Sequence, residues 1–183
     1  MKFLILIILS FNAEANYMVS TGTFVPYFAK AQTNTSGSTK TFELNPYIGI
    51  GKQINMTGNN YFMPELGYSY YLNNPKNMRR ESIFLHYNFS RVFSQQFIAR
   101  YGLTSNWYRI VGLGGSENLK NGTSSTTFPS PDETRTSYYT TLNFGGEAFV
   151  SSKKYSLRFD LNIMSFAELD NRAFNYLFTL NIY

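Results

Sequence analysis

Apolar and polar side chains alternate along much of this chain, most regularly from Tyr155 to Met164. Side chains of an extended strand point to opposite faces in turn, whereas a helix would distribute both kinds around its circumference. The segment is therefore predicted to be a strand with one apolar face and one polar, charged face. The apolar face holds Tyr155, Leu157, Phe159, Leu161 and Ile163, and the polar face holds Ser156, Arg158, Asp160 and Asn162.

Seven further segments show the same alternation, although the first of them is less regular. Each is long enough for the roughly 9 to 11 residues that a tilted membrane-spanning strand requires. The eight predicted strands lie within residues 17–29 and at residues 42–54, 61–72, 81–89, 96–108, 137–150, 155–164 and 172–183.

The connections between these segments alternate in length. Short connections at residues 55–60, 90–95 and 151–154 separate longer ones at residues 30–41, 73–80, 109–135 and 165–171. Short turns at one end and longer loops at the other are typical of outer-membrane barrels, and an even number of strands places both termini at the same end. The pattern predicts an all-β chain folded as an eight-stranded antiparallel up-and-down transmembrane barrel.

The C-terminal segment from Tyr176 to Tyr183 alternates like the others and ends in an aromatic residue. With this ending and this layout, residues 16–183 resemble the small eight-stranded outer-membrane barrels of the OmpA/OmpX type. The resemblance implies a monomer in the outer membrane of a Gram-negative bacterium, with periplasmic termini. It also implies that the barrel-assembly machinery recognises the C-terminal strand. Tyr183 departs from the family pattern because it is in phase with the polar residues Thr179 and Asn181.

The first 15 residues have the composition of a secretory signal peptide. Lys2 precedes an apolar run at residues 3–11, and Ala13, Glu14 and Ala15 form a small-residue cleavage site. The run is too short for a spanning helix, which needs about 20 apolar residues. We therefore expect a signal peptide at residues 1–15 and one mature barrel domain at residues 16–183.

Composition narrows the classes of partner and site. The chain has no cysteine, one histidine and a net charge of +5, so neither a disulfide framework nor a transition-metal site is expected. Positive charge suits nucleic acid or an anionic membrane surface, and a secretory signal favours the membrane. We expect no cofactor, no nucleic-acid partner and no catalytic site.

The alternation alone leaves open which face of the barrel is outside. A soluble periplasmic barrel that binds a small apolar ligand would be apolar inside. Against this alternative, the polar faces are rich in Gly, Ser, Asn and Thr, and aromatic residues gather near strand ends, as at Trp107 and Tyr138. Arg158 exposed to lipid would cost about 2–4 kcal/mol at the bilayer midplane. We therefore expect the apolar faces to contact lipid and the charged faces to line the lumen.

The charged residues of the inward faces are predicted to form a network. Counting outward from the short turns places Glu147 opposite Arg158, and His86 opposite Arg100. An eight-stranded barrel is just wide enough for its own side chains, so such charges are expected to neutralise one another and plug the lumen. A narrow ion-conducting pore is the alternative. The predicted network contains Glu65, His86, Arg100, Glu147, Arg158 and Asp160.

The longer loops carry the candidate contact surfaces. Residues 109–135 form the longest connection, and loops over about 12–15 residues are often functional, so an extracellular ligand is expected to bind there. Basic residues gather on the same side, where arginine and lysine can form charge-assisted hydrogen bonds with the phosphates of lipopolysaccharide. These candidates are Lys76, Arg79, Arg80 and Arg109. The expected role is structural or surface-interactive.

Overall fold

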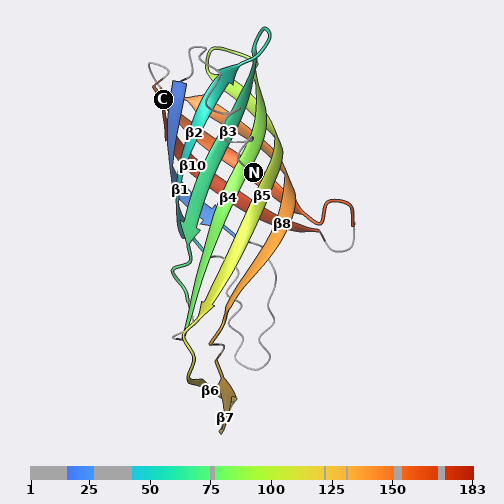
Figure 1. Cartoon of the computed structure of the whole chain (residues 1–183). Coiled ribbons are helices and arrows are strands. Elements are labelled where there is room, and N and C mark those ends of the chain that lie inside the picture. Colours follow the sequence, from blue (N-terminus) through green and yellow to red (C-terminus); the bar gives the residue numbers. More distant parts are fainter. Residues whose placement is uncertain are drawn as a thin grey trace, which may run out of the picture.

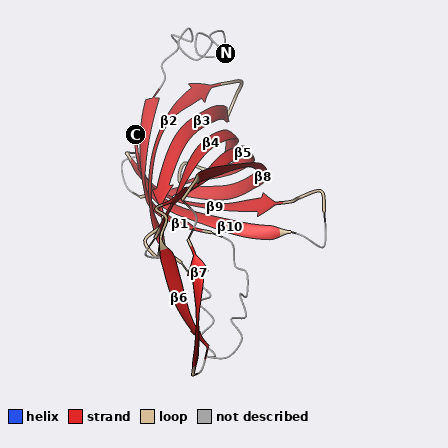
Figure 2. Ribbon diagram, turned by 60° about the horizontal axis from the view of Figure 1, so that its bottom comes forward, coloured by secondary structure: helices blue, strands red, loops and turns tan. Residues whose placement is uncertain are grey.

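Antiparallel strands close into a barrel in which each strand pairs with its neighbours along the chain (Figures 1 and 2). This computed structural model describes residues 16–26, 43–74, 77–121, 123–130, 132–150, 154–168 and 172–183. Within them, pairing of β1 with β10 closes the barrel, so no barrel strand has a free edge. The barrel strands are β1 (Asn16–Val25), β2 (Asn45–Asn55), β3 (Asn60–Tyr70), β4 (Met78–Val92), β5 (Phe97–Gly112), β8 (Thr134–Phe149), β9 (Tyr155–Met164) and β10 (Ala173–Ile182).

The barrel confirms the eight-stranded fold predicted from the alternation. Strand β9 has the predicted limits, and the ends of the other seven strands lie within a few residues of the predicted ones. The largest differences are in β4, β5 and β8, which continue further toward the long loops than predicted. The first strand was irregular in sequence because Met18 and Phe24 are buried, whereas Thr21 is exposed on the outer face. The predicted signal peptide at residues 1–15 lies outside the described residues.

The longest connection, which the sequence predicts only as a loop, contains regular structure. Strands β5 and β8 continue into it, and a separate hairpin of β6 (Ser116–Asn121) and β7 (Ser124–Pro129) projects beyond the barrel (Figure 1). Gly114 and Gly115 have positive φ angles of 69° and 92°, a conformation that glycine adopts without strain, and they redirect the chain into the hairpin. The sequence carries no sign of β6 and β7 because they are mostly polar and lack the apolar alternation that marks a half-buried strand.

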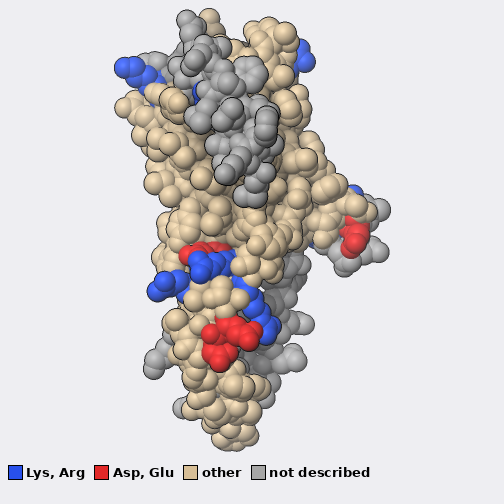
Figure 3. All heavy atoms as spheres, in the orientation of Figure 1, with Lys and Arg blue, Asp and Glu red and all other residues tan. Residues whose placement is uncertain are grey.

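The two faces of the barrel wall differ sharply in polarity. Outward side chains such as Ile48 (58% exposed) and Leu157 (57% exposed) are apolar, whereas inward Glu65 and Asp160 are at most 1% exposed. In Figure 3, a broad belt without Lys, Arg, Asp or Glu separates charged groups at the short-turn end from a charged band toward the hairpin. An apolar outer belt around a polar interior is the arrangement of a transmembrane barrel. No helix among the described residues is long and apolar enough to cross a membrane.

The interior contains two layers. Buried charged side chains fill the half nearer the short turns, which is the half that holds the end of β10. Toward the long loops, rings pack together, with the Phe24 and Phe84 centroids 4.8 Å apart. This aromatic layer consists of Phe24, Tyr47, Tyr71, Phe84 and Leu177, with Tyr108 packed against it.

Candidate functional site

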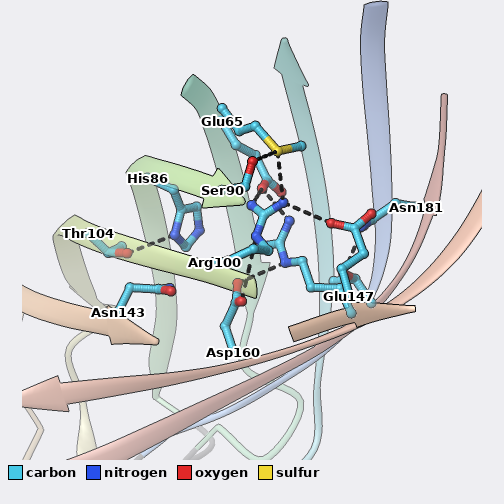
Figure 4. Close-up of polar contacts among 12 residues, drawn as sticks. Glu65, His86, Ser90, Arg100, Thr104, Asn143, Glu147, Asp160 and Asn181 are labelled. Atoms are coloured by element: carbon cyan, nitrogen blue, oxygen red, sulfur yellow. Dashed lines mark hydrogen bonds and ion pairs between the residues drawn. The ribbon is translucent and has the colours of Figure 1, made fainter. Parts of the chain in front are cut away.

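Five charged side chains from four strands converge inside the barrel (Figure 4). The side chains of all five are fully buried. We call this group the ionic network. It consists of Glu65 from β3, Arg100 from β5, Glu147 from β8, and Arg158 and Asp160 from β9.

Arg100 makes the first set of contacts, with carboxylates from three other strands. Its Nη1 donates to Glu147 Oε2 at 3.0 Å, while its Nη2 lies 3.8 Å from Glu65 Oε2 and its Nε lies 3.7 Å from Asp160 Oδ1. Arg158 makes the second set of contacts. Its Nη1 donates to Glu65 Oε2, and its Nε lies 2.8 Å from Asp160 Oδ2. Arg100 therefore contacts carboxylates from three strands and Arg158 contacts carboxylates from two, as a planar guanidinium with five N–H donors permits.

Glu147 has neutral partners as well as Arg100. Its Oε1 accepts hydrogen bonds from Asn181 Nδ2 at 3.0 Å, from the Ser156 hydroxyl and from the Tyr183 hydroxyl. The Tyr183 ring also packs against Phe149, with centroids 5.6 Å apart. The inward phase of the C-terminal aromatic residue, visible as an irregularity in the sequence, therefore brings its hydroxyl to the ionic network.

A chain of hydrogen bonds links the ionic network to the aromatic layer. The Tyr47 hydroxyl donates to Glu65 Oε1 at 2.8 Å and lies 3.2 Å from Nε2 of His86. Nδ1 of His86 lies 2.8 Å from Thr104 Oγ1, and the His86 ring stacks on Phe84. The Tyr47 ring occupies the space where a Cβ at Gly67 would be, so this glycine allows the ring to lie against the wall.

The structure places all six residues of the predicted network in the interior, but it changes their pairing. Glu147 is opposite Arg158 in the strand register, as the turn length predicted, yet its ion-pair partner is Arg100. His86 is opposite Thr104, so its predicted pairing with Arg100 was wrong. The reason is the β4–β5 turn, which is centred on Gln95 instead of Phe93 and therefore shifts every pair.

Sequence reasoning missed the aromatic layer. Tyr47, Phe84 and Leu177 lie in the same phase as the polar residues of their strands, so the inward faces are not uniformly polar. The sequence does indicate these inward rings. Phe84 directly follows the outward-facing Ile83, and Tyr47 lies two residues from each of the inward-facing Asn45 and Gly49, so both rings fall on the inner face. They were missed because apolar residues were all assigned to the outer face.

The predicted lipopolysaccharide contacts separate into two groups. Arg80 is held by the protein, because it donates to Glu43 at 2.9 Å and to Asn74 at 3.1 Å and lies 4.9 Å above the Tyr71 ring. Burial raises the pKa of the Tyr71 hydroxyl above its ordinary value. Arg79 and Arg109 are exposed, and Arg109 pairs with Glu81 at 2.9 Å. Lys76 lies outside the described residues.

Comparisons with known proteins support the fold and nothing finer. No family model matches the chain, and no curated protein matches its sequence. Among solved structures, Ail, the attachment invasion locus protein of Yersinia pestis, covers 93% of this chain and 99% of its own, at 6% identity and a TM-score of 0.50. The chain has the fold of the small eight-stranded outer-membrane barrels.

Two further solved structures are similar to the chain. Ail in complex with the heparin analogue sucrose octasulfate gives a TM-score of 0.53 at 7% identity, with 93% of this chain and 99% of that chain covered. Neisserial surface protein A gives a TM-score of 0.49 at 10% identity, with 93% and 97% covered. At these identities the likeness extends to the fold alone.

Replacing Arg100 with Met should lower the free energy of unfolding by about 3–5 kcal/mol, because Glu147 would remain buried without its ion-pair partner. Adding Glu147→Gln should recover part of this loss by removing the unpaired charge. The measurement is urea-induced unfolding in phospholipid vesicles, followed by tryptophan fluorescence. The matched control, Arg91→Met, removes an exposed arginine from β4 and should change stability by less than about 0.5 kcal/mol. Equal losses for Arg100→Met and Arg91→Met would contradict a stabilising ionic network.

Proposed function

We propose that this chain is an outer-membrane protein of a Gram-negative bacterium with a structural or surface-interaction role, and that interior side chains close its barrel. One observation carries the proposal. Arg100, Arg158 and three carboxylates form a buried ionic network inside a wall whose outer face is apolar. Lipid accounts for the apolar outer face, and mutual neutralisation accounts for the buried charges.

Two layers in series support a closed lumen. The Arg158–Glu65 ion pair crosses the lumen between β9 and β3, which lie on opposite sides of the barrel, so an ion passing through would have to separate it. Arg100 of β5 adds the ion pair with Glu147 of the neighbouring β8 at the same level. Beyond the ionic network, the ring centroid of Phe84 lies 4.8 Å from that of Phe24 and 5.8 Å from that of Tyr47. An apolar layer offers a permeating ion no partner to replace its hydration.

The two alternatives from the sequence fit these observations less well. A soluble barrel for an apolar ligand needs an apolar interior, whereas Glu65, Arg100 and Asp160 occupy this one. A narrow pore needs a continuous polar path, whereas the aromatic layer lies across the long-loop half of the lumen.

The remaining elements of the proposal concern chemistry and orientation. His86 is 1% exposed, and its two ring nitrogens lie within hydrogen-bond distance of the Tyr47 and Thr104 hydroxyls, so we propose a structural role for it. Our proposal includes no catalytic residue and no cofactor. We also propose, by analogy with the fold, that the termini face the periplasm and the long loops face outward. We further propose a monomer, with no nucleic-acid partner, that the barrel-assembly machinery recognises through β10. The outward row of Phe178, Leu180 and Ile182 would serve this recognition, because Tyr183 is turned inward.

Purified protein in planar lipid bilayers should give no steady discrete conductance, because the two interior layers occlude the lumen. A variant with Phe24→Ala and Phe84→Ala tests the aromatic layer, and it should raise the frequency of brief openings without producing a stable open level while the ionic network persists. Adding Arg100→Ala should increase conductance further. Steady single-channel conductance of the unmodified protein would contradict the closed lumen and favour the pore.

A second candidate function is binding of an extracellular ligand through the β6–β7 hairpin. The hairpin extends beyond the barrel mouth (Figure 1), and every described side chain of β7 is exposed. It presents Phe128, 49% exposed, at a position that the barrel does not cover. Ail has been solved with a heparin analogue bound, so a sulfated polysaccharide is a suitable first probe for this chain.

Replacing residues 116–129 with a short Gly-Ser linker should abolish attachment of cells that display the protein to heparin-coated or matrix-coated surfaces. The barrel should persist, because Val111 and Thr134 still pair at the base of the hairpin. Phe128→Ser serves as a milder variant and should weaken attachment without removing the hairpin. Unchanged attachment by cells that display an intact barrel would argue against this function.

A further inference from the structure

Two shallow apolar grooves lie side by side on the outer face of the barrel, toward the long loops. One has a volume of about 460 Å³ and lies over β1, β2, β3 and β4, and the other has about 410 Å³ and lies over β3, β4, β5 and β8. Leu66 and Ile83 line both grooves and form the ridge between them. Both grooves lie within the apolar belt, where the neighbouring molecules of a transmembrane barrel are lipid acyl chains.

A polar cluster lies at the loop end of both grooves. Tyr68 lines the first groove, and its hydroxyl donates to Glu81 Oε2 at 3.0 Å. Arg109 lines the second groove and donates to Glu81 Oε1 at 2.9 Å. Glu81 therefore joins the ends of the two grooves into one headgroup-sized polar patch.

This patch retains free positive charge. Arg109 is 49% exposed at its side chain, so part of its guanidinium remains available beyond the bond to Glu81. Arg79 lies two residues further along β4 on the same outward face, paired in register with Val111, and is exposed. It has no ion-pair partner among the described residues. Two arginines against one carboxylate leave the patch cationic.

Aromatic side chains mark the level of this patch. Trp107 and Tyr138 line the second groove beside Arg109, with ring centroids 6.4 Å apart. Tryptophan and tyrosine are enriched where the hydrocarbon of a bilayer meets its headgroups. The grooves thus extend into the hydrocarbon, while Arg79 and Arg109 lie at the depth of lipid phosphates.

We propose that this surface binds one phosphorylated lipid with several acyl chains, whose chains occupy the two grooves and whose phosphate accepts hydrogen bonds from Arg109 and Arg79. Paired grooves favour a lipid over a protein partner, because both lie inside the bilayer-facing belt. The identity of the lipid rests on the proposed outer-membrane location, in which the long-loop end of the barrel lies in the outer leaflet. The occupant is then the lipid A portion of lipopolysaccharide, a phosphorylated glycolipid.

Trp107 provides a direct probe, because it is the only tryptophan of the chain and it lines the second groove. Protein reconstituted in phosphatidylcholine with brominated acyl chains should have quenched Trp107 emission. Adding lipid A should displace the brominated chains and restore Trp107 emission up to a plateau. Half-maximal recovery should need a lower mole fraction of lipid A than of unbrominated phosphatidylglycerol. Equal mole fractions for the two lipids would overturn the proposal.

Variants separate the phosphate contacts from general insertion. The double variant Arg79→Gln and Arg109→Gln should need about tenfold more lipid A for half-maximal recovery, since it loses charge-assisted hydrogen bonds. Leu85→Phe, which narrows the second groove, should also weaken the recovery. Arg91→Gln is the matched control, because Arg91 is an exposed arginine near the opposite end of β4. This variant should need the same mole fraction of lipid A for half-maximal recovery as the unmodified protein.

The controls also distinguish this proposal from the proposed function. Vesicle flotation establishes insertion first, and a chain that does not float would contradict both the membrane location and the lipid site. If the chain floats but the double variant needs no more lipid A than the unmodified protein, the lipid site alone would be contradicted.

Discussion

The contacts of Arg100 and Arg158 with three buried carboxylates are the interaction on which the rest of this structure depends. A charge buried without a partner costs several kcal/mol, so these five side chains are stable in the interior only together. Their positions fix the phase of β3, β5, β8 and β9, because each strand must turn its charged residues inward. The period of two then turns the apolar residues of the same strands outward, toward lipid.

The sequence predicted those properties that depend on local periodicity. Alternation located the barrel strands, and the short β8–β9 turn was sufficient to place Glu147 opposite Arg158. It did not predict that Arg100 contacts Glu147 on the neighbouring strand β8, because the long connection between β5 and β8 gives no short turn from which to count their register. The predicted partner of His86 was also wrong. The β4–β5 turn is centred two residues later than predicted, and this changes the partner of every residue in the two strands.

The missed features have a common physical origin. Tyr47 and Phe84 face inward because the interior must be filled, and an aromatic ring over Gly67 fills it as well as a polar side chain would. The β6–β7 hairpin is held by backbone hydrogen bonds, which are independent of apolar patterning. With the closed interior that we propose, two surfaces are left to meet other molecules, the projecting hairpin and the outer face at the level of Arg109.

The orientation of the two faces can be measured directly along β9. The chain has no cysteine, so single cysteines at Leu157, Phe159 and Leu161, and at Ser156 and Asn162, each give one spin label in lipid bilayers. Labels at the first three positions should collide frequently with oxygen dissolved in the bilayer and rarely with a water-soluble nickel chelate. Labels at Ser156 and Asn162 should be accessible to neither. If Leu157, Phe159 and Leu161 were accessible to nickel, or if accessibility did not alternate, the transmembrane barrel with a closed, charged interior would be contradicted.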